Sequence, residues 1–231
     1  MDAHLEPVEA PVVSDREALD RQQAWWNTAL SQNPAMFGNE PSEPAKKAAE
    51  LFSKAGVGTV LELGAGAGRD TKLFALHGFK VCAVDYSTGA LGALEKKLQN
   101  LGLSDSVETV QHDIRQPLPF PDASFDACYS HMLFCMALSD DELKRLSLEI
   151  RRILEPGGLC VYTVRHTGDS HYGAGKPRGG NLYEMNGFIV HYFDLAKIER
   201  LAEGYEILDV ADFEEGSLPR RLFRVTLKKR P

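Results

Sequence analysis

The residues best suited to chemistry in this chain lie at positions 60–70, which read Val-Leu-Glu-Leu-Gly-Ala-Gly-Ala-Gly-Arg-Asp. An apolar run breaks there into a turn with three glycines, and a helix is expected to follow. Glycine lets backbone N–H groups approach a ligand and adopts positive φ without steric cost. A dinucleotide site would place its third glycine at Arg69, and Glu62 at the strand end would meet a cationic ligand rather than a pyrophosphate. The pattern therefore predicts a cradle for a small ligand and argues against a dinucleotide.

Acidic residues close two later apolar runs. Asp85 follows the run 81–84, which places it 23 positions after Glu62 (85 − 62), and Asp113 follows a short run that ends in Gln-His. Residues 125–131 look like a fourth strand with its exit, and residues 154–158 like the turn before a fifth. A glycine turn alone is more often another nucleotide site or only a tight turn, and acids at strand ends commonly cap helices. The joint order and spacing of five segments outweighs those readings.

In these segments the chain resembles the class I S-adenosylmethionine-dependent methyltransferases, whose first motif has the form acidic-x-Gly-x-Gly-x-Gly. The resemblance implies that Asp85 binds the ribose hydroxyls, that Asp113 accepts from the adenine amino group and that Ile114 packs on the ring. It implies S-adenosyl-L-methionine as the cofactor. The cofactor-binding residues expected on this basis are Glu62, Gly64, Ala65, Gly66, Gly68, Asp70, Asp85, Tyr86, Asp113, Ile114 and Ser130.

The methyl group of a sulfonium is already electrophilic, so such an enzyme mainly aligns a nucleophile and excludes water, and it needs a base only for a protonated acceptor. The candidate catalytic residues are His131, His166, His171, Tyr172 and His191. A single histidine in a loop is more often a surface or hydrogen-bonding residue than a base. Arg165 and Arg178 are candidates for binding an anionic acceptor, with a solvent-exposed or loop-stabilising role as the alternative.

The elements that must position these residues alternate in type. Strands are expected at 58–63, 80–85, 107–112, 125–130 and 158–164, with helices at 44–55, 69–77, 87–101 and 140–154. A short helix at 195–202 precedes strands at 205–213 and 221–228. Such alternation predicts an α/β fold with a doubly wound parallel sheet. The resemblance adds a Rossmann-like, three-layer α/β/α architecture with seven strands in the order 3-2-1-4-5-7-6 and strand 7 antiparallel.

Two segments flank this pattern. Residues 1–44 read as an amino-terminal arm or lid, with a helix near 16–30 that carries Trp25 and Trp26, while residues 45–231 form the methyltransferase domain. Residues 165–192 lack helical periodicity and are rich in Gly, His, Tyr and Arg. A long segment without regular structure at the carboxyl end of a parallel strand is usually functional, so this is the expected substrate loop.

Bulk composition excludes several classes of protein. The chain has 231 residues, 43% of them hydrophobic, and carries 26 basic against 33 acidic residues for a net charge of −7. That balance argues against a nucleic-acid ligand, and no apolar run reaches the roughly 18 residues of a membrane span. The four cysteines lack Cys-x-x-Cys spacing and read as buried free thiols, and no metal site is expected. Without a basic leader or apolar signal region at its start, the protein is expected in the cytoplasm, as a monomer or homodimer.

The function implied is methyl transfer from S-adenosylmethionine to a small molecule, with sulfur or another soft atom favoured over nitrogen or oxygen. The nearest general likeness is to small stand-alone methyltransferases of the tellurite-resistance and thiopurine type, on the strength of Gly68-Arg69-Asp70 and the insertion after strand five. The alternatives are a protein methyltransferase and a non-catalytic S-adenosylmethionine-binding module. The sequence Ser-His-Met-Leu after strand four, in place of Asn-Pro-Pro-Tyr, makes methylation of nucleic-acid bases a poor expectation.

Overall fold

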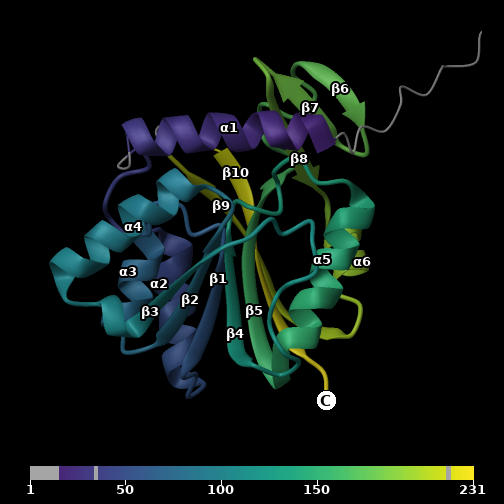
Figure 1. Cartoon of the computed structure of the whole chain (residues 1–231). Helices are drawn as coiled ribbons and strands as arrows, with labels where there is room; N and C mark the ends of the chain where they lie inside the picture. Colours follow the sequence, from purple (N-terminus) through teal and green to yellow (C-terminus); the bar gives the residue numbers. More distant parts are fainter. Residues whose placement is uncertain (1–15, 34–35, 217–219) are drawn as a thin grey trace, which may run out of the picture.

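Alternating strands and helices build a central sheet that is covered by helices on both faces (Figure 1). The structure is a computed structural model, and it describes residues 16–33, 36–216 and 220–231. The rest of the predicted arm, residues 1–15, 34 and 35, lies outside the described residues. The strands of the main sheet are β1 (Thr59–Leu63), β2 (Lys80–Asp85), β3 (Val107–Gln111), β4 (Phe125–His131), β5 (Leu154–His166), β9 (Tyr205–Glu215) and β10 (Arg220–Lys229).

The sheet has the predicted topology. Strands β3, β2, β1, β4 and β5 lie side by side in that order and are parallel. Strand β10 pairs antiparallel with β5, and β9 pairs antiparallel with β10. Counting β9 and β10 as strands 6 and 7 gives the expected order 3-2-1-4-5-7-6, so the fold prediction is confirmed.

Successive side chains along each strand point alternately to the two faces of the sheet and so toward the two layers of helices. Val60, Val81 and Tyr129 pack against α2 (Glu43–Lys54) and α3 (Arg69–Leu76), while Ala83 packs against α4 (Thr88–Leu101). The opposite face, with Leu61, packs against α5 (Asp140–Ile153) and α6 (Leu195–Leu201). A single turn of 3₁₀ helix, Ser104–Ser106, leads into β3. All four cysteines are buried and free, as predicted.

Helix starts follow from capping residues in the sequence. The Ser42 side chain accepts a hydrogen bond from the N–H of Ala45, and Pro44 occupies the first turn, where its missing N–H costs nothing. Ser139 and Glu142 form a reciprocal capping box at α5.

The segment 165–192 differs from its prediction, because it contains regular structure. It forms β6 (Lys176–Gly179), β7 (Leu182–Met185) and most of β8 (Phe188–Phe193), which pair as antiparallel hairpins. The two connecting turns, Gly180-Asn181 and Asn186-Gly187, have positive φ at both positions, as two-residue hairpin turns of type I′ require. The dipeptide Asn186-Gly187 is a strong hairpin signal, which could have predicted the β7–β8 hairpin from the sequence. Strand β8 also pairs in parallel with the end of β5, where Arg165 lies opposite Tyr192.

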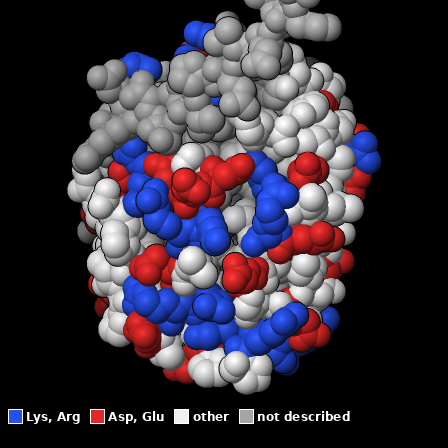
Figure 2. Space-filling view, turned by 90° about the vertical axis from the view of Figure 1, so that its right-hand side faces the viewer, with Lys and Arg blue, Asp and Glu red and all other residues white. Residues whose placement is uncertain are grey.

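Helix α1 (Arg16–Gln32) lies across the carboxyl edge of the sheet, next to the β6–β8 hairpins and above α4 (Figure 1). The Asn27 side-chain oxygen accepts a hydrogen bond of 2.7 Å from the Ser87 hydroxyl, which ties α1 to the start of α4. Within the described part of the chain, no helix is both long and apolar enough to cross a membrane. Figure 2 shows the face on the right-hand side of Figure 1, where basic and acidic side chains are interspersed.

Candidate functional site

A cavity opens where β1, β2 and β3 end. Ten residues line it, and its empty volume is about 420 Å³ including the open mouth. Five are predicted cofactor-binding residues: Gly64, Asp85, Tyr86, Asp113 and Ile114. The others are Val84, His112, Leu133, Met136 and Leu138. The carboxyl edge of a parallel sheet is where such folds bind ligands.

The glycine turn forms one side of this cavity. Gly64, Gly66 and Gly68 have φ of 75°, 54° and 71°, a region that other residues rarely adopt. A Cβ on Gly64 would lie 3.1 Å from the Cβ of Leu133. On Gly68 it would lie 2.1 Å from Leu94 Cδ1, so this glycine serves the packing of α3 on α4. The turn therefore needs glycine for its backbone, and at Gly64 also for the space under Leu133.

Asp85 is held by the turn that it faces. Its Oδ2 accepts a hydrogen bond of 2.9 Å from the N–H of Gly66, and its Oδ1 accepts one of 2.8 Å from the N–H of Ser87. Burial raises the pKa of the Asp85 carboxyl, against the opposing effect of these N–H donors. The carboxylate is thereby fixed in the wall of the cavity.

Glu62 lies beneath the turn and does not line the cavity. Thr71 donates a hydrogen bond of 2.5 Å to its Oε2. Burial, with the Asp70 carboxylate as a further contribution, raises the pKa of Glu62 well above its usual value. The position at the end of β1 is as predicted, while direct contact with the cofactor stays a prediction, as it does for Ala65 and Gly66.

Asp70 and Ser130 have partners inside the protein. Asp70 accepts hydrogen bonds from the backbone and hydroxyl of Ser42, at 2.7 and 2.8 Å, and from the Tyr129 hydroxyl at 3.2 Å. Ser130 donates to the Leu63 carbonyl at 3.1 Å. Neither side chain lines the cavity, so these bonds position the turn and the ends of β1 and β4, and cofactor contact for Asp70 and Ser130 stays a prediction.

The far side of the cavity carries Asp113 and His112. Arg115 binds the Asp113 carboxylate through Nε and a terminal nitrogen, with the shortest contact at 2.6 Å. Burial acts to raise the pKa of Asp113, but the hydrogen bonds from Arg115 outweigh it and hold the pKa below its usual value. The Nε2 atom of His112 is buried and has no hydrogen-bond partner among the residues that the structure describes. A buried polar atom of this kind in a cavity wall is suited to a ligand.

His131 lies at the exit of β4, two residues before Leu133 of the cavity wall. Its Nδ1 is 2.8 Å from Thr163 Oγ1 and its Nε2 is 3.2 Å from Glu215 Oε2. The Met132 N–H donates to the same threonine oxygen at 3.0 Å, which favours the threonine proton on Nδ1 and the imidazole proton on Nε2. Met132 has φ of 63°, and strained residues of this kind concentrate at functional sites. Sequence reasoning found His131 but missed Thr163 and Glu215, which are distant in the chain.

His191 has structural partners on both ring nitrogens. The side chain is fully buried, with Nδ1 2.7 Å from the Leu138 carbonyl and Nε2 in contact with the Lys197 ammonium group. Burial, reinforced by the charge of Lys197, lowers its pKa to about 4. Lys197 is in turn paired with Asp140 at 2.6 Å. These contacts favour a structural role for His191 between β8 and α6, and its catalytic role stays a prediction.

The remaining candidates gather at the end of β5, away from the cavity wall. Arg165 donates a hydrogen bond of 2.6 Å to the buried Asp169, which also accepts from the backbone of His171 at 2.8 Å. The His166 Nδ1 accepts from the N–H of Gly168, and burial lowers its pKa. These partners indicate structural roles for Arg165, His166 and His171.

Of two further candidates, Arg178 lies on β6 and Tyr172 in the turn segment that precedes it. The Tyr172 hydroxyl donates to Asn181 at 2.8 Å, and its ring packs edge-on against Tyr183 and Tyr192. Arg178 pairs with Glu184 across the β6–β7 hairpin. These contacts support the loop-stabilising alternative for Arg178 and leave a chemical role for Tyr172 a prediction.

Several residues of the cavity wall escaped sequence reasoning. Leu133, Met136 and Leu138 lie in the apolar run after β4, whose position at the same sheet edge could have indicated them. His112 directly precedes a predicted site residue, and only the orientation of its ring shows that it faces the cavity.

Comparison with known proteins supports this geometry. Residues 61–162 match a family described as a methyltransferase domain. Phosphatidylethanolamine N-methyltransferase from Cereibacter sphaeroides is 31% identical over 125 residues, which cover 54% of this chain and 59% of that protein. The chain thus spans less than two thirds of the length of this curated relative.

Two solved structures show the same fold. Burkholderia thailandensis 1,6-didemethyltoxoflavin-N1-methyltransferase, solved with 1,6-didemethyltoxoflavin and S-adenosylhomocysteine bound, has a TM-score of 0.74 at 20% identity, covering 100% of this chain and 98% of that chain. TehB from Haemophilus influenzae has a TM-score of 0.63 at 15% identity, covering 82% and 62% of the two chains. At these identities the likeness concerns the fold alone.

Proposed function

We propose that this chain, which belongs to the class I S-adenosylmethionine-dependent methyltransferases, transfers the methyl group of S-adenosylmethionine to a small-molecule acceptor. One observation carries the proposal: five residues from three separate strand ends, which the family motifs select for the cofactor, line a single cavity at the carboxyl edge of the sheet.

The residues present fit this cofactor. The turn at Gly64 brings bare backbone to the cavity at a point where a side chain would collide with Leu133. Asp85 is anchored by two N–H donors, and a carboxylate so fixed retains lone pairs for sugar hydroxyls. His112 offers an unpartnered nitrogen, and Asp113 keeps acceptor capacity beyond its bonds with Arg115. We assign these groups to the sugar and the base, and the turn to the amino-acid half.

The bound cofactor supplies an electrophilic methyl group on a sulfonium. The protein then has to orient the acceptor, exclude water and take up a proton where the acceptor carries one. Among the candidates, His131 is best placed for that proton, because it lies closest in the chain to the cavity wall. An acceptor that replaced Glu215 at Nε2 would leave the opposite nitrogen held by Thr163. We infer that acceptors whose nucleophilic atom is soft or carries no proton depend least on His131 as a base.

A small acceptor is favoured over a protein because α1 and the β6–β8 hairpins crowd the carboxyl edge of the sheet (Figure 1). The relative from Cereibacter sphaeroides carries a name that specifies methylation of a phospholipid amine. A protein methyltransferase and a non-catalytic binding module remain the alternatives, since an intact cradle does not by itself prove turnover.

The test combines calorimetry with S-adenosylhomocysteine and a product assay with panels of thiols, amines, hydroxyl compounds and peptides. Binding together with methylation of a small acceptor is the expected result. Binding with methylation of peptides alone would favour the protein methyltransferase, and binding without product for every acceptor would favour the module. Absence of binding would refute the proposal as a whole.

A further inference from the structure

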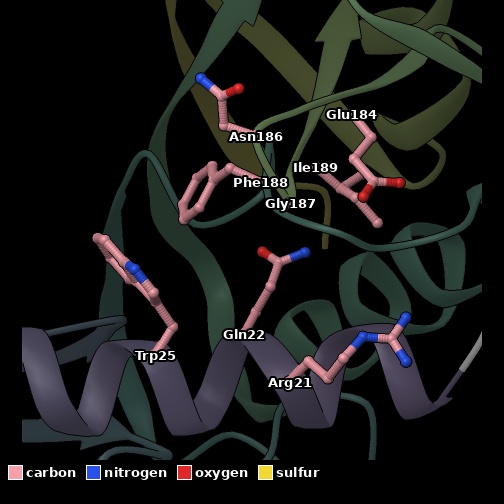
Figure 3. A pocket seen from close by; sticks show the side chains of 8 residues that line it. All are labelled: Arg21, Gln22, Trp25, Glu184, Asn186, Gly187, Phe188 and Ile189. Carbon is pink, nitrogen blue, oxygen red and sulfur yellow. The ribbon is translucent and has the colours of Figure 1, made fainter.

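A second cavity lies between α1 and the β7–β8 hairpin (Figure 3). Arg21, Gln22 and Trp25 line it from the helix, and Glu184, Phe188 and Ile189 line it from the hairpin. Its empty volume, including the open mouth, is about 610 Å³.

The floor of this cavity holds an unsatisfied amide. Gln22 is 3% exposed, and neither its side-chain oxygen nor its side-chain nitrogen has a hydrogen-bond partner. The side chain extends from α1 toward Phe188 and Gly187 on the hairpin (Figure 3). A buried amide with neither group paired is costly to a fold, so a ligand that pairs both groups would gain from it.

Aromatic rings form the wall beside this amide. The Phe188 ring lies 5.4 Å from the Trp25 ring and 5.5 Å from the Trp26 ring, in edge-on arrangements. Trp25 is 47% exposed although it is large and apolar. Such rings favour a flat, apolar ligand body.

Charges around the cavity are already engaged. Glu184 pairs with Arg178, and Arg21 also has an interaction partner. One residue of each sign therefore lines the cavity, and neither is free to neutralise a charged ligand. This balance favours a ligand without net charge.

The cavity shares a wall with the cofactor cavity. Ile189 packs against Ala137, and the two neighbours of Ala137, Met136 and Leu138, line the cofactor cavity. The Leu138 carbonyl also accepts the hydrogen bond from His191 of β8. A ligand in the second cavity is thus separated from the cofactor site by one segment of chain.

We propose that this cavity is a second ligand site, and that Gln22 there selects a neutral, planar ring bearing a cyclic amide, through paired N–H···O and O···H–N hydrogen bonds. A carboxamide pairs twofold only with a group that presents N–H and C=O on one edge, as a cis amide does. Ring amides are held cis, whereas ordinary peptide bonds are trans and place the two groups on opposite sides. Gln22 therefore distinguishes a cyclic amide from a peptide backbone.

The chain supplies its own reporter for a test, because Trp25 and Trp26 are its two tryptophans and both belong to this aromatic wall. Tryptophan fluorescence is titrated with uracil, 2-pyridone and hypoxanthine, with and without S-adenosylhomocysteine. The matched ligand is 1,3-dimethyluracil, which keeps the ring but lacks N–H donors. The variant is Gln22→Met, with Gln99→Met on the exposed face of α4 as the control.

At least one cyclic amide is expected to give a saturable response in the wild type and in Gln99→Met. The affinity for that cyclic amide should fall about tenfold or more in Gln22→Met. If the wild type binds uracil, it should bind 1,3-dimethyluracil about tenfold more weakly. Urea unfolding should find Gln22→Met as stable as the wild type or more so, since the change removes an unsatisfied amide. Equal affinity in wild type and Gln22→Met, or no response to any cyclic amide while S-adenosylhomocysteine binds, would overturn the proposal. A normal response in protein that does not bind S-adenosylhomocysteine would instead refute the proposed function.

Discussion

The substitution Asp85→Asn tests whether the carboxylate at the end of β2 binds the cofactor or only shapes the turn. In the wild type each carboxylate oxygen accepts one backbone N–H, from Gly66 at 2.9 Å and from Ser87 at 2.8 Å. An asparagine has a single oxygen, so one of the two N–H groups would face the side-chain NH₂. The loss of one charge-assisted hydrogen bond costs about 1.5–3 kcal/mol, partly offset because a neutral amide is easier to bury than a carboxylate. We expect the free energy of unfolding to fall by about 1–2 kcal/mol.

Cofactor affinity should fall as well. Hydrogen bonds to a carboxylate are roughly twice as strong as those to a neutral amide, so the change should weaken binding of S-adenosylhomocysteine about tenfold. This affinity is measured by calorimetry in the absence of urea, where the variant is fully folded. The variant binding S-adenosylhomocysteine as tightly as the wild type would refute the assignment of Asp85 to the cofactor.

Asp126→Asn is the matched control at the opposite end of the sheet. The Asp126 carboxylate accepts the backbone N–H groups of Gly58 and Thr59 at 2.9 and 2.8 Å, both on Oδ2. Because a single amide oxygen can keep both bonds, this variant should lose no more stability than Asp85→Asn and should keep its affinity for S-adenosylhomocysteine. An equal loss of affinity in both variants would mean that the effect reflects stability and not the cofactor site.

Three further changes test other parts of the structure. Gly68→Ala should lower the free energy of unfolding by about 2–5 kcal/mol, because of its positive φ and the collision with Leu94. Gly78→Ala, with φ of 89° but open space around the added Cβ, should lower it by only about 1–2 kcal/mol. Urea unfolding compares the two variants, and equal losses would contradict the packing argument. His131→Gln should reduce turnover of a protonated acceptor about 10²–10⁴-fold without changing calorimetric affinity for S-adenosylhomocysteine, and unchanged turnover would exclude His131 as the base. Because the pKa of His191 falls from 6.5 to about 4 on folding, the unfolded chain takes up this proton first, and stability should decrease as pH falls from about 6.5 to about 4. His191→Gln should flatten that slope in unfolding measured across the range, and an unaltered slope would show that the residue does not titrate in this way.

The cofactor side of the molecule could be predicted because its geometry is encoded locally. The turn at Gly64 and the acids at Asp85 and Asp113 each follow directly from a strand, and parallel strands end at one edge. The resemblance to methyltransferases, expected from these residues, is supported by the match over residues 61–162, and the expected fold is shared with a solved methyltransferase. Asp70 and Ser130 share the motif positions but bond inward, which only the folded structure reveals.

The acceptor side could not be predicted to the same degree, because its contacts join distant segments. His191 looks like a loop histidine in sequence, but pairing with Leu138 and Lys197 makes it a buried structural residue. Gln22 lies in a helix whose periodicity gives no sign that its amide is left unpaired. The hairpin at Asn186-Gly187 was within reach of sequence reasoning, since the dipeptide favours the observed turn.

Strand β5 extends beyond the end of its parallel neighbour β4, and this extra length affects how the protein can evolve. Its pairing with β4 ends at Thr163, and the following residues Arg165 and His166 carry β8. The hairpins thus pair with the main sheet through one short seam, and further contacts join them to Leu138 and to the rings of α1. Insertions or exchanges that keep this seam and these contacts would leave the other strand ends undisturbed, so this part of the chain can diversify as a replaceable module.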